Sequence, residues 1–354
     1  MLPEISPYTP TDFCLLDHCR RVAAVVQCTS HQLFLAARVK AGIGSAALLH
    51  HAPLTDFPGL GGEDWLVPAL LRAFHHSGDG SEHLRRLAEI IHVANRFDEL
   101  YELRATEPRS TAEIIAGLRR LAGENSWSMD PVNALENVAR GGNVKAPAPS
   151  SLPILPQAIL RIQQLLNRPE SAAGQIDRIA ATVFRPLFNR RSMQSLLPHS
   201  LEAAELAHRL AARMPAIDRA EAFLCGLLHD IGKAWIDQLD VFSSATMIGL
   251  LDYGCPPVYA ENLLIGCDHG MAGGDIAAYW RLSARQVEAI RYHHQPERSG
   301  SPLAHLLYLV EWRLGHLEDL PSAHRVDLCM RSTGFTPHSL EAWHNGQPAL
   351  AMTA

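Results

Sequence analysis

The stretch LCGLLHDIGK (residues 224–233) decides the fold and the chemistry that we expect from this chain. Its apolar run is typical of a buried helix, and it ends in three polar side chains, His229, Asp230 and Lys233. Burying such groups without partners costs free energy, so a buried helix end that carries them implies partners. An imidazole beside a carboxylate is a pair of metal ligands, and Lys233 lies four residues after His229, on the same side of a helix. An ordinary surface cluster at a helix end is the alternative interpretation.

Length and composition set the class of the protein. Its 354 residues suffice for two domains, and 47% hydrophobic residues suffice for buried cores. The formal net charge of -6 argues against a general binder of nucleic acids or of anionic membranes. Seven cysteines without a CxxC pair are expected to be reduced thiols. Because we find no signal-peptide pattern and no membrane-spanning apolar run, we expect a cytoplasmic protein.

Helical periodicity dominates the chain, and strand-like alternation is scarce, so we expect an all-α protein. Residues 139–153, rich in Gly, Pro and Ser, form the best linker, which predicts domains at 1–140 and 150–354. In the first domain we expect helices at 12–26, 31–39, 65–74, 81–101 and 110–121, the last capped by Ser110 or Thr111. In the second we expect them at 155–166, 199–213, 218–232, 257–266, 270–281, 283–294 and 301–317.

The second half carries further ligand-type side chains, each in or beside an apolar helix. They are separated by roughly one helical hairpin, so a helical bundle could bring them to one point. Imidazoles with carboxylates suit iron, manganese, zinc or nickel. Because one ion does not need so many ligands, we expect two ions that share Asp230, activate a water and clamp a phosphoryl group, with Lys233 or an arginine taking the developing charge. The predicted ligands are His199, His229, Asp230, His269, His293, His294 and Glu311. Each one alone also fits a helix cap or a satisfied buried group.

At these residues the chain resembles the HD superfamily, an all-helical fold of metal-dependent phosphohydrolases and phosphodiesterases named for its adjacent His and Asp. The likeness is strongest to the HDOD and HD-GYP signalling branches and covers roughly residues 150–317. Four segments resemble successive HDOD helices in the same order: LPILPQAILRIQQLLN (152–167), PHSLEAAELAHRLA (198–211), AFLCGLLHDIGK (222–233) and GCDHGMAGGDIAAYWRLSARQVEAIRYHHQP (266–296).

The resemblance also implies roles for the predicted ligands. One ion would be held by His199, His229, Asp230 and Glu311. A second would be held by His269, His293 and His294, with Asp230 bridging. Lys233 would face substrate phosphate, so that Asp230 and Lys233 are the predicted catalytic residues.

The chain departs from the family pattern in three places. Glu311 stands where the catalytic branches usually have Asp, although the longer carboxylate can still bind a metal. The Gly-Tyr-Pro signature is missing after the paired histidines, which weakens a claim to hydrolyse cyclic di-GMP. Between Asn167 and Ser192 the chain is shorter than the HDOD pattern and lacks its usual middle helices.

The first half resembles the same family in a degenerate form, over about residues 12–125. DHCRRVAAVV (17–26) resembles the first ligand helix with His18, and SAALLHH (45–51) has His51 in the aspartate position. The segment at 74–102 resembles the paired-histidine region, with Asn95 in the acid position. Loss of both carboxylates would remove the bridge of a dinuclear site, so we expect tandem HD-domain bundles of which the first is non-catalytic. Packing and capping are the plainer roles for His50, His51, His75 and His76.

Two functions of different classes follow. The first is a metal-dependent phosphohydrolase or phosphodiesterase that acts on a nucleotide or cyclic nucleotide in signalling, with a small phosphorylated ligand as partner and a dinuclear iron or manganese centre, zinc or nickel being alternatives. The second is a non-catalytic HDOD-type scaffold that binds a signalling protein or a second copy of the chain. A di-iron oxygenase with the same ligands is a third interpretation. A faint resemblance to HD-type relaxases is a fourth, against which the acidic charge argues.

Overall fold

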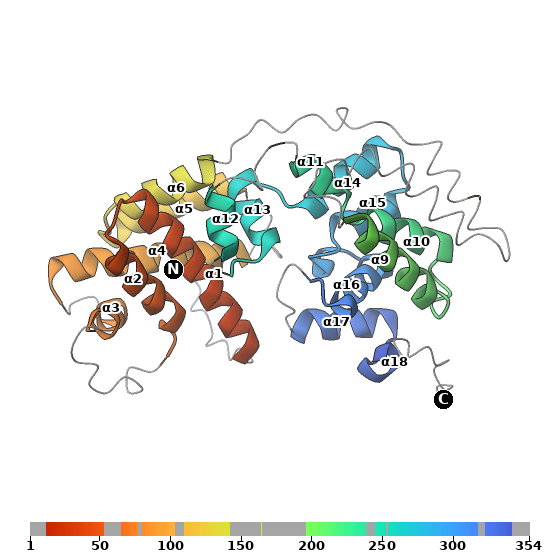
Figure 1. Cartoon of the computed structure of the whole chain (residues 1–354), viewed down its shortest axis with the longest axis horizontal. Helices are drawn as coiled ribbons and strands as arrows, with labels where there is room; N and C mark the ends of the chain where they lie inside the picture. The colour runs from red at the N-terminus through yellow and green to blue at the C-terminus, as the bar shows by residue number, and fades with distance from the viewer. Residues whose placement is uncertain are drawn as a thin grey trace. The chain divides into compact units, whose positions relative to one another are not determined.

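A computed structural model of the chain describes residues 12–52, 65–76, 80–102, 110–141, 164, 196–237, 239, 245–252, 254–317 and 323–341. Within these ranges the chain is helical and contains no β-strand, which confirms the all-α prediction (Figure 1). None of the helices in the described part is long and apolar enough to cross a membrane. The helix expected at 155–166 lies outside the described residues, apart from position 164.

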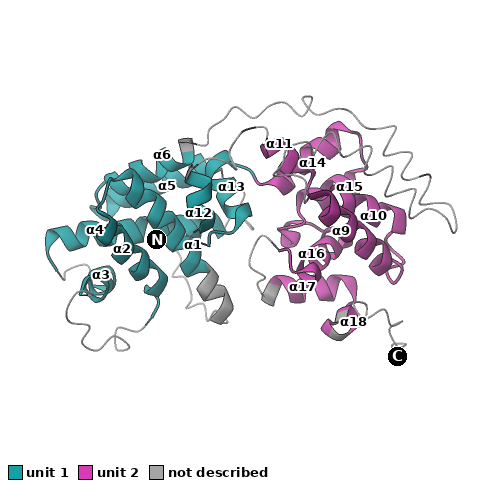
Figure 2. Ribbon diagram, in the orientation of Figure 1, with its two compact units in different colours: residues 1–145, 240–267 teal, residues 146–239, 268–354 magenta. Residues whose placement is uncertain are grey.

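The chain folds into two compact units (Figure 2). Unit 1 comprises Met1–Lys145 and Asp240–Cys267, and unit 2 comprises Ala146–Leu239 and Asp268–Ala354. The first boundary falls inside the linker expected at 139–153. The segment Asp240–Cys267 groups with unit 1, which differs from a continuous second domain at 150–354.

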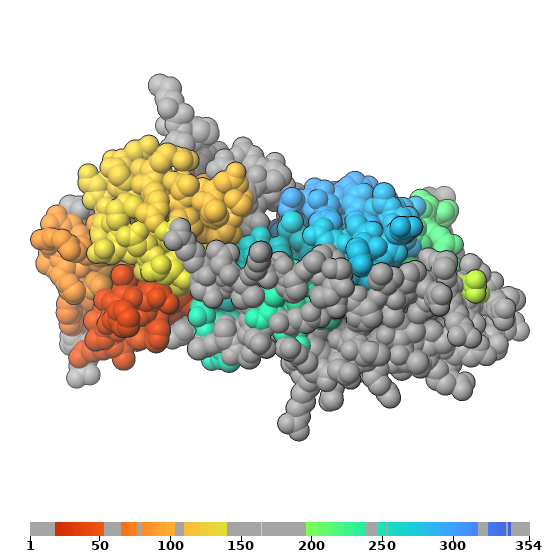
Figure 3. All heavy atoms as spheres, turned by 90° about the horizontal axis from the view of Figure 1, so that it is seen from above, coloured from red at the N-terminus to blue at the C-terminus, as the bar shows by residue number. Residues whose placement is uncertain are grey.

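Unit 1 is built around α1, whose residues 22–26 are buried. This helix contacts α2, α4, α6 and α12, while α3 and α5 pack on α4. Figure 3 shows the atoms of α3 and α4 in orange and those of α5 and α6 in yellow as one continuous surface. The helices of unit 1 are α1 (Asp12–Gln32), α2 (Ala37–Leu49), α3 (Leu66–His75), α4 (Glu82–Glu102), α5 (Thr111–Glu124), α6 (Asp130–Gly141), α12 (Ala245–Asp252) and α13 (Pro257–Ile265).

Helices α12 and α13 belong to unit 1 because their apolar side chains fill its core. Met247 and Leu250 of α12 are fully buried, and α12 packs on α1. Tyr259 of α13 is buried with its ring centroid 4.3 Å from that of Tyr101 in α4. Thr111 at the start of α5 donates a hydrogen bond to the carbonyl of Asn262 at 3.2 Å. A segment that is late in the sequence therefore completes the earlier unit.

Unit 2 is organised around α16, in which residues 303–311 are all buried. It contacts α9, α10, α15 and α17, and Figure 1 shows α9, α10, α15 and α16 side by side. Side-chain caps set several helix starts, because Asp218, Asp268 and Ser283 each accept a backbone N–H of the first turn. The helices of unit 2 are α9 (Leu196–Ala211), α10 (Arg219–Leu228), α11 (Ile231–Asp237), α14 (His269–Tyr279), α15 (Ala284–Arg291), η5 (Pro296–Arg298), α16 (Pro302–Leu314), α17 (Ala323–Thr333) and α18 (Pro337–Glu341).

Two expected helices are wrong in their bounds. The range 31–39 is not one helix. Its first two residues belong to α1, which ends at Gln32, and its last three belong to α2, which begins at Ala37. Between them Phe34 adopts a left-handed backbone with φ 54° and is exposed, so the chain reverses where its apolar pattern looked continuous. The helix expected at 218–232 is interrupted near its end, since α10 ends at Leu228 and α11 begins at Ile231. Helices α6, α12, α17 and α18 were not predicted, whereas the capping box of Ser110 with Glu113 is confirmed.

Helices α9 and α10 of unit 2 pack closely, and their contact depends on Gly226. A Cβ added there would lie 2.7 Å from Cα of Ala204 and 2.9 Å from the carbonyl oxygen of Ala203. Both atoms belong to the backbone of α9, which cannot move aside as a flexible side chain could.

We predict that Gly226→Ala lowers the free energy of unfolding by about 1–3 kcal/mol, because the two helices are forced apart. The matched control is Gly249→Ala in α12, where an added Cβ meets nothing within 4 Å. That substitution should leave stability unchanged or raise it by up to about 1 kcal/mol through helix propensity. Urea unfolding followed by circular dichroism measures both; equal midpoints for the two variants would contradict the packing argument.

Candidate metal centre

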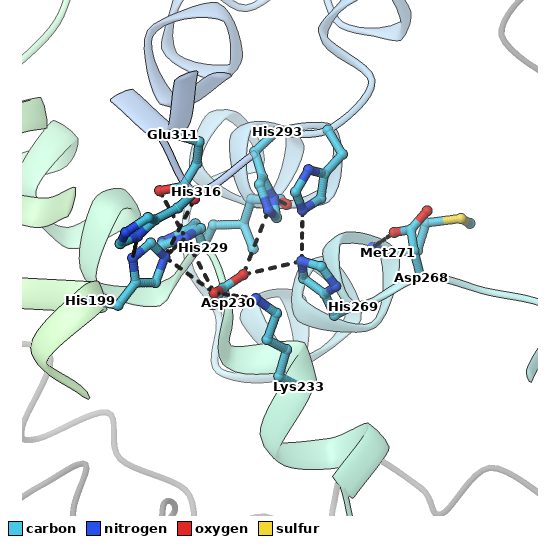
Figure 4. Close-up of polar contacts among 12 residues, drawn as sticks. His199, His229, Asp230, Lys233, Asp268, His269, Met271, His293, Glu311 and His316 are labelled. Carbon is cyan, nitrogen blue, oxygen red and sulfur yellow. Dashed lines mark hydrogen bonds and ion pairs between the residues drawn. The ribbon is translucent and has the colours of Figure 1, made fainter. Parts of the chain in front are cut away.

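The candidate site lies at the break between α10 and α11, where His229 and Asp230 stand outside both helices (Figure 4). His229 ends α10, and its Nδ1 donates to the carbonyl of Gly226 at 2.7 Å. A carbonyl oxygen only accepts, so Nδ1 carries the proton and Nε2 presents a lone pair to the site. The ring is therefore fixed in the tautomer that a metal ligand requires.

The two carboxylate oxygens of Asp230 face different groups of imidazoles. Oδ2 lies 3.4 Å from Nε2 of His199 and 3.5 Å from Nε2 of His229. Oδ1 lies 3.1 Å from Nε2 of His269 and 3.9 Å from Nε2 of His293. This is the arrangement of a carboxylate that can bridge two cations.

The first group combines His199 from α9, His229 and Glu311 from α16, and we call it cluster A. The Nε2 atoms of His199 and His229 are 3.1 Å apart. Glu311 places Oε2 3.4 Å from Nε2 of His199 and Oε1 3.4 Å from Nε2 of His229. The exposed His316 adds a contact that the sequence reasoning missed, since its Nδ1 lies 2.7 Å from Nδ1 of His199. His316 follows Gly315, the C-cap residue of α16. The sequence around it contains no pattern typical of metal ligands.

The second group, cluster B, comprises Asp230, His269, His293 and His294, whose ligand atoms lie within 4.8 Å of one another. His269 is the first residue of α14, and its Nε2 is 2.7 Å from Nε2 of His294. His293 repeats the geometry of His229, because its Nδ1 donates to the carbonyl of Ile290 at 2.7 Å. All seven predicted ligands thus meet around Asp230; that they bind metal stays a prediction.

Gly232 makes the approach of α11 to α14 possible. A Cβ at this position would lie 1.9 Å from the carbonyl oxygen of His269 and 2.7 Å from the backbone nitrogen of Gly273. Only a residue without a side chain lets His269 reach Asp230 across this contact. The glycine that follows the His-Asp pair is therefore part of the site geometry.

The protonation states are set by burial and by neighbouring charges. Burial acts to raise the pKa of Asp230, but His229, Lys233 and contacts with His199 and His269 hold it well below its ordinary value. The Nζ atom of Lys233 lies 2.6 Å from Oδ2 of Asp230. Burial acts to lower the pKa of His199, but Asp230 and Glu311 raise it to about 10. The pKa shifts of His199 and Asp230 thus have the same origin, the close approach of imidazole and carboxylate inside the site.

Burial and the neighbouring imidazoles lower the pKa of His293 and of His294 well below the ordinary value, so both rings are neutral. Among the described residues, the buried atoms His293 Nε2 and Glu311 Oε1 have no hydrogen-bond partner. Buried polar atoms usually have one, so these two atoms suit direct binding to a cation. Mixed imidazole and carboxylate donors favour iron, manganese, zinc or nickel over magnesium. The residues present fit a dinuclear metal centre.

Unit 1 contains a related group, formed by His18 of α1, His50 at the end of α2 and Asn95 of α4. The Nε2 atoms of His18 and His50 are 3.2 Å apart, close to the 3.1 Å between His199 and His229. Burial, the largest influence, lowers the pKa of His50 to about 4, so this ring is neutral. His75 and His76 lie apart from this group: both are exposed, His75 in the last turn of α3 and His76 as its C-cap residue.

Comparison with known proteins finds a family match that covers part of unit 2 and the segment Asp240–Cys267 of unit 1. The family model of the HDOD domain matches residues 179–296, which include every predicted ligand except Glu311. A crystal structure assigned to a phosphohydrolase from Shewanella amazonensis SB2B aligns with 56% of this chain and 90% of that chain, at 21% identity and a TM-score of 0.39.

Curated relatives share a shorter stretch. Ribonuclease Y of Mycoplasmoides gallisepticum is 35% identical over 125 residues, which are 35% of this chain and 19% of the relative. Ribonuclease Y of Rhodopirellula baltica is 38% identical over 82 residues, 22% of this chain and 16% of the relative. The chain thus spans less than a fifth of the length of these relatives.

The two-cluster geometry predicts unequal losses of metal. Asp230→Asn should remove about two equivalents of bound manganese or iron relative to the parent, because both clusters lose their shared oxygen donor. Glu311→Gln should remove about one, because only cluster A uses this carboxylate. Elemental analysis of purified full-length protein measures both, with Glu205→Gln on the exposed face of α9 as the control. Equal losses from the first two variants would contradict the bridging role of Asp230.

Proposed function

We propose, from the match of residues 179–296 to the HDOD domain, that the chain is a member of the HD superfamily and that unit 2 is a metal-dependent phosphohydrolase. The reaction would be hydrolysis of a phosphate ester or phosphodiester in a nucleotide-type ligand. The observation that carries this proposal is the orientation of Asp230, with one oxygen toward cluster A and the other toward cluster B. Two cations held in this way are a recurrent arrangement for displacement at phosphorus.

Each part of the centre has a role in this proposal. Cluster A and cluster B would hold one ion each, and bound ions would supply an activated water and a clamp for the phosphoryl oxygens. Lys233 is partly exposed beside Asp230, so its ammonium is placed to bind a phosphate oxygen at the edge of the site. His316 contacts the far side of the His199 ring and would orient that ligand.

The likeness to Ribonuclease Y supports an RNA phosphodiester as a second substrate class. The formal charge of -6 favours a small nucleotide over a long polyanion, because a nucleic-acid surface is normally basic. We therefore propose mononucleotides or cyclic nucleotides first and short RNA second.

The scaffold interpretation is supported by one observation. Lys233 donates to the Asp230 oxygen that faces cluster A at 2.6 Å, so an ion pair within unit 2 stabilises this buried carboxylate. A module that binds a signalling partner, or a second copy of the chain, needs no more than such a stable polar core. The two functions differ in turnover, so a kinetic experiment separates them.

We predict that full-length protein loaded with manganese or iron hydrolyses at least one member of a panel: bis(p-nitrophenyl) phosphate, nucleoside monophosphates, cyclic nucleotides and a short RNA. Lys233→Met should lower kcat/KM by about 10²–10³-fold while metal content is retained, because the variant loses only charge stabilisation of the transferred group. Asp230→Asn should abolish turnover together with metal binding, and Glu205→Gln should change neither. Metal-loaded protein without turnover on the whole panel would favour the scaffold.

A further inference from the structure

The group of polar atoms in unit 1 has a geometry that its degenerate sequence did not suggest. Nε2 of His18, Nε2 of His50 and Oδ1 of Asn95 come from three helices and converge on one point. The two nitrogens are 3.2 Å apart, and Oδ1 of Asn95 lies 2.9 Å from His18 and 3.0 Å from His50. His50 is fully buried, while His18 and Asn95 are half-buried.

In each of the three side chains, the polar atom that points away from the convergence point donates a hydrogen bond. These hydrogen bonds determine whether the atoms at the convergence point are donors or acceptors. Nδ1 of His50 donates to the carbonyl of Ala47 at 2.6 Å. Nδ1 of His18 donates to Oδ2 of Asp98 at 2.7 Å. Nδ2 of Asn95 donates to Oε1 of Glu99 at 2.8 Å, so the amide oxygen must face the two rings. With both rings protonated at Nδ1, three lone pairs point at one another.

The carboxylate of Asp98 is held in place by Arg21 and does not depend on the three converging atoms. Nε of Arg21 donates to its Oδ1 at 2.8 Å and Nη2 donates to its Oδ2 at 2.9 Å, a bidentate pair inside the unit. The carboxylate is therefore a fixed acceptor behind the His18 ring. A carboxylate behind an imidazole is the usual outer partner of a metal-binding histidine.

Three converging acceptors require a positive centre, which is either a proton or a metal cation. A second proton on His18 could serve Asn95 and His50, but it would leave His50 Nε2 and Asn95 Oδ1 as two acceptors 3.0 Å apart. A cation between the three atoms satisfies all of them at once. The exposed His51 adjoins the point, with its ring centroid 4.1 Å from that of His50, and can supply a further imidazole.

We propose that unit 1 binds one divalent transition-metal ion through His18, His50 and Asn95, with His51 completing the coordination. The donors are imidazoles and a neutral amide oxygen, which suit zinc, cobalt, nickel or copper and disfavour magnesium and calcium. Unit 2 has Asp230 directly after His229, whereas unit 1 has His51 directly after His50, so an imidazole replaces the carboxylate at this place in the sequence. The site therefore holds a single ion that fastens α1, α2 and α4 together, and it is independent of hydrolysis in unit 2.

Cobalt binding to the full-length chain tests this proposal. The background variant carries Asp230→Asn and Glu311→Gln, which disable the centre of unit 2. In this background, titration with Co²⁺ should give visible d–d absorption that saturates at about one equivalent, and the melting temperature should rise with metal because only the folded chain binds it. His50→Gln should abolish both effects, whereas His75→Gln on the exposed end of α3 should change neither.

The sharpest variant is Asn95→Asp, which adds negative charge at one ligand with almost no change of shape. It should tighten cobalt binding by about tenfold or more, because an anionic oxygen replaces a neutral one. A gain of affinity cannot come from loss of folding, so this variant stays informative even if His50→Gln unfolds. No cobalt absorption in the background chain, or affinity unmoved by Asn95→Asp and His50→Gln, would overturn the proposal.

Discussion

The Asp230 carboxylate, buried among the imidazoles of His199, His229, His269 and His293, is the interaction on which unit 2 depends. A buried carboxylate without compensation is too costly for a folded protein, so its partners must be held in place before it can be tolerated. Those partners come from α9, the end of α10, α14 and the turn after α15, which are brought together by the packing around α16. The helical bundle is thus arranged so that its polar centre and its apolar core stabilise each other.

Much of this site could be predicted because each predicted ligand lies in or beside an apolar helix, and the apolar sequence of such a helix predicts that it is buried. What could not be predicted depends on distant partners. The sequence around residues 218–232 contains no helix-breaking signal. The break at His229 and Asp230 lets these side chains contact residues far along the chain, such as Glu311. The same holds for α12, whose buried Met247 and Leu250 fit either core by periodicity alone. His316 was not predicted, because it is exposed and contacts Nδ1 of His199, on the side of the ring that faces away from the other predicted ligands.

The two units contain the same geometry with different charge. His18, His50 and Asn95 in unit 1 are spaced as His199, His229 and Glu311 are in unit 2, with an amide in place of a carboxylate. Asn95 and Glu311 both lie on a long helix that packs on the first ligand helix, α4 on α1 and α16 on α9. The two groups also differ in size, because unit 2 adds cluster B beside Asp230, whereas the candidate group of unit 1 comprises His18, His50 and His51 with Asn95.

Residues 240–267 belong to unit 1 although they lie between two segments of unit 2 in the sequence, and this affects the order in which the units can fold during synthesis. Unit 1 is incomplete until α12 and α13 have been synthesised, and both helices follow His199, His229 and Asp230 in the sequence. Domains are usually finished in the order of their synthesis, but here the earlier domain must wait for a piece that lies inside the later one. If the chain were divided at residue 146, the C-terminal fragment would carry α12 and α13 without the core that buries their apolar side chains, and the N-terminal fragment would lack these two helices.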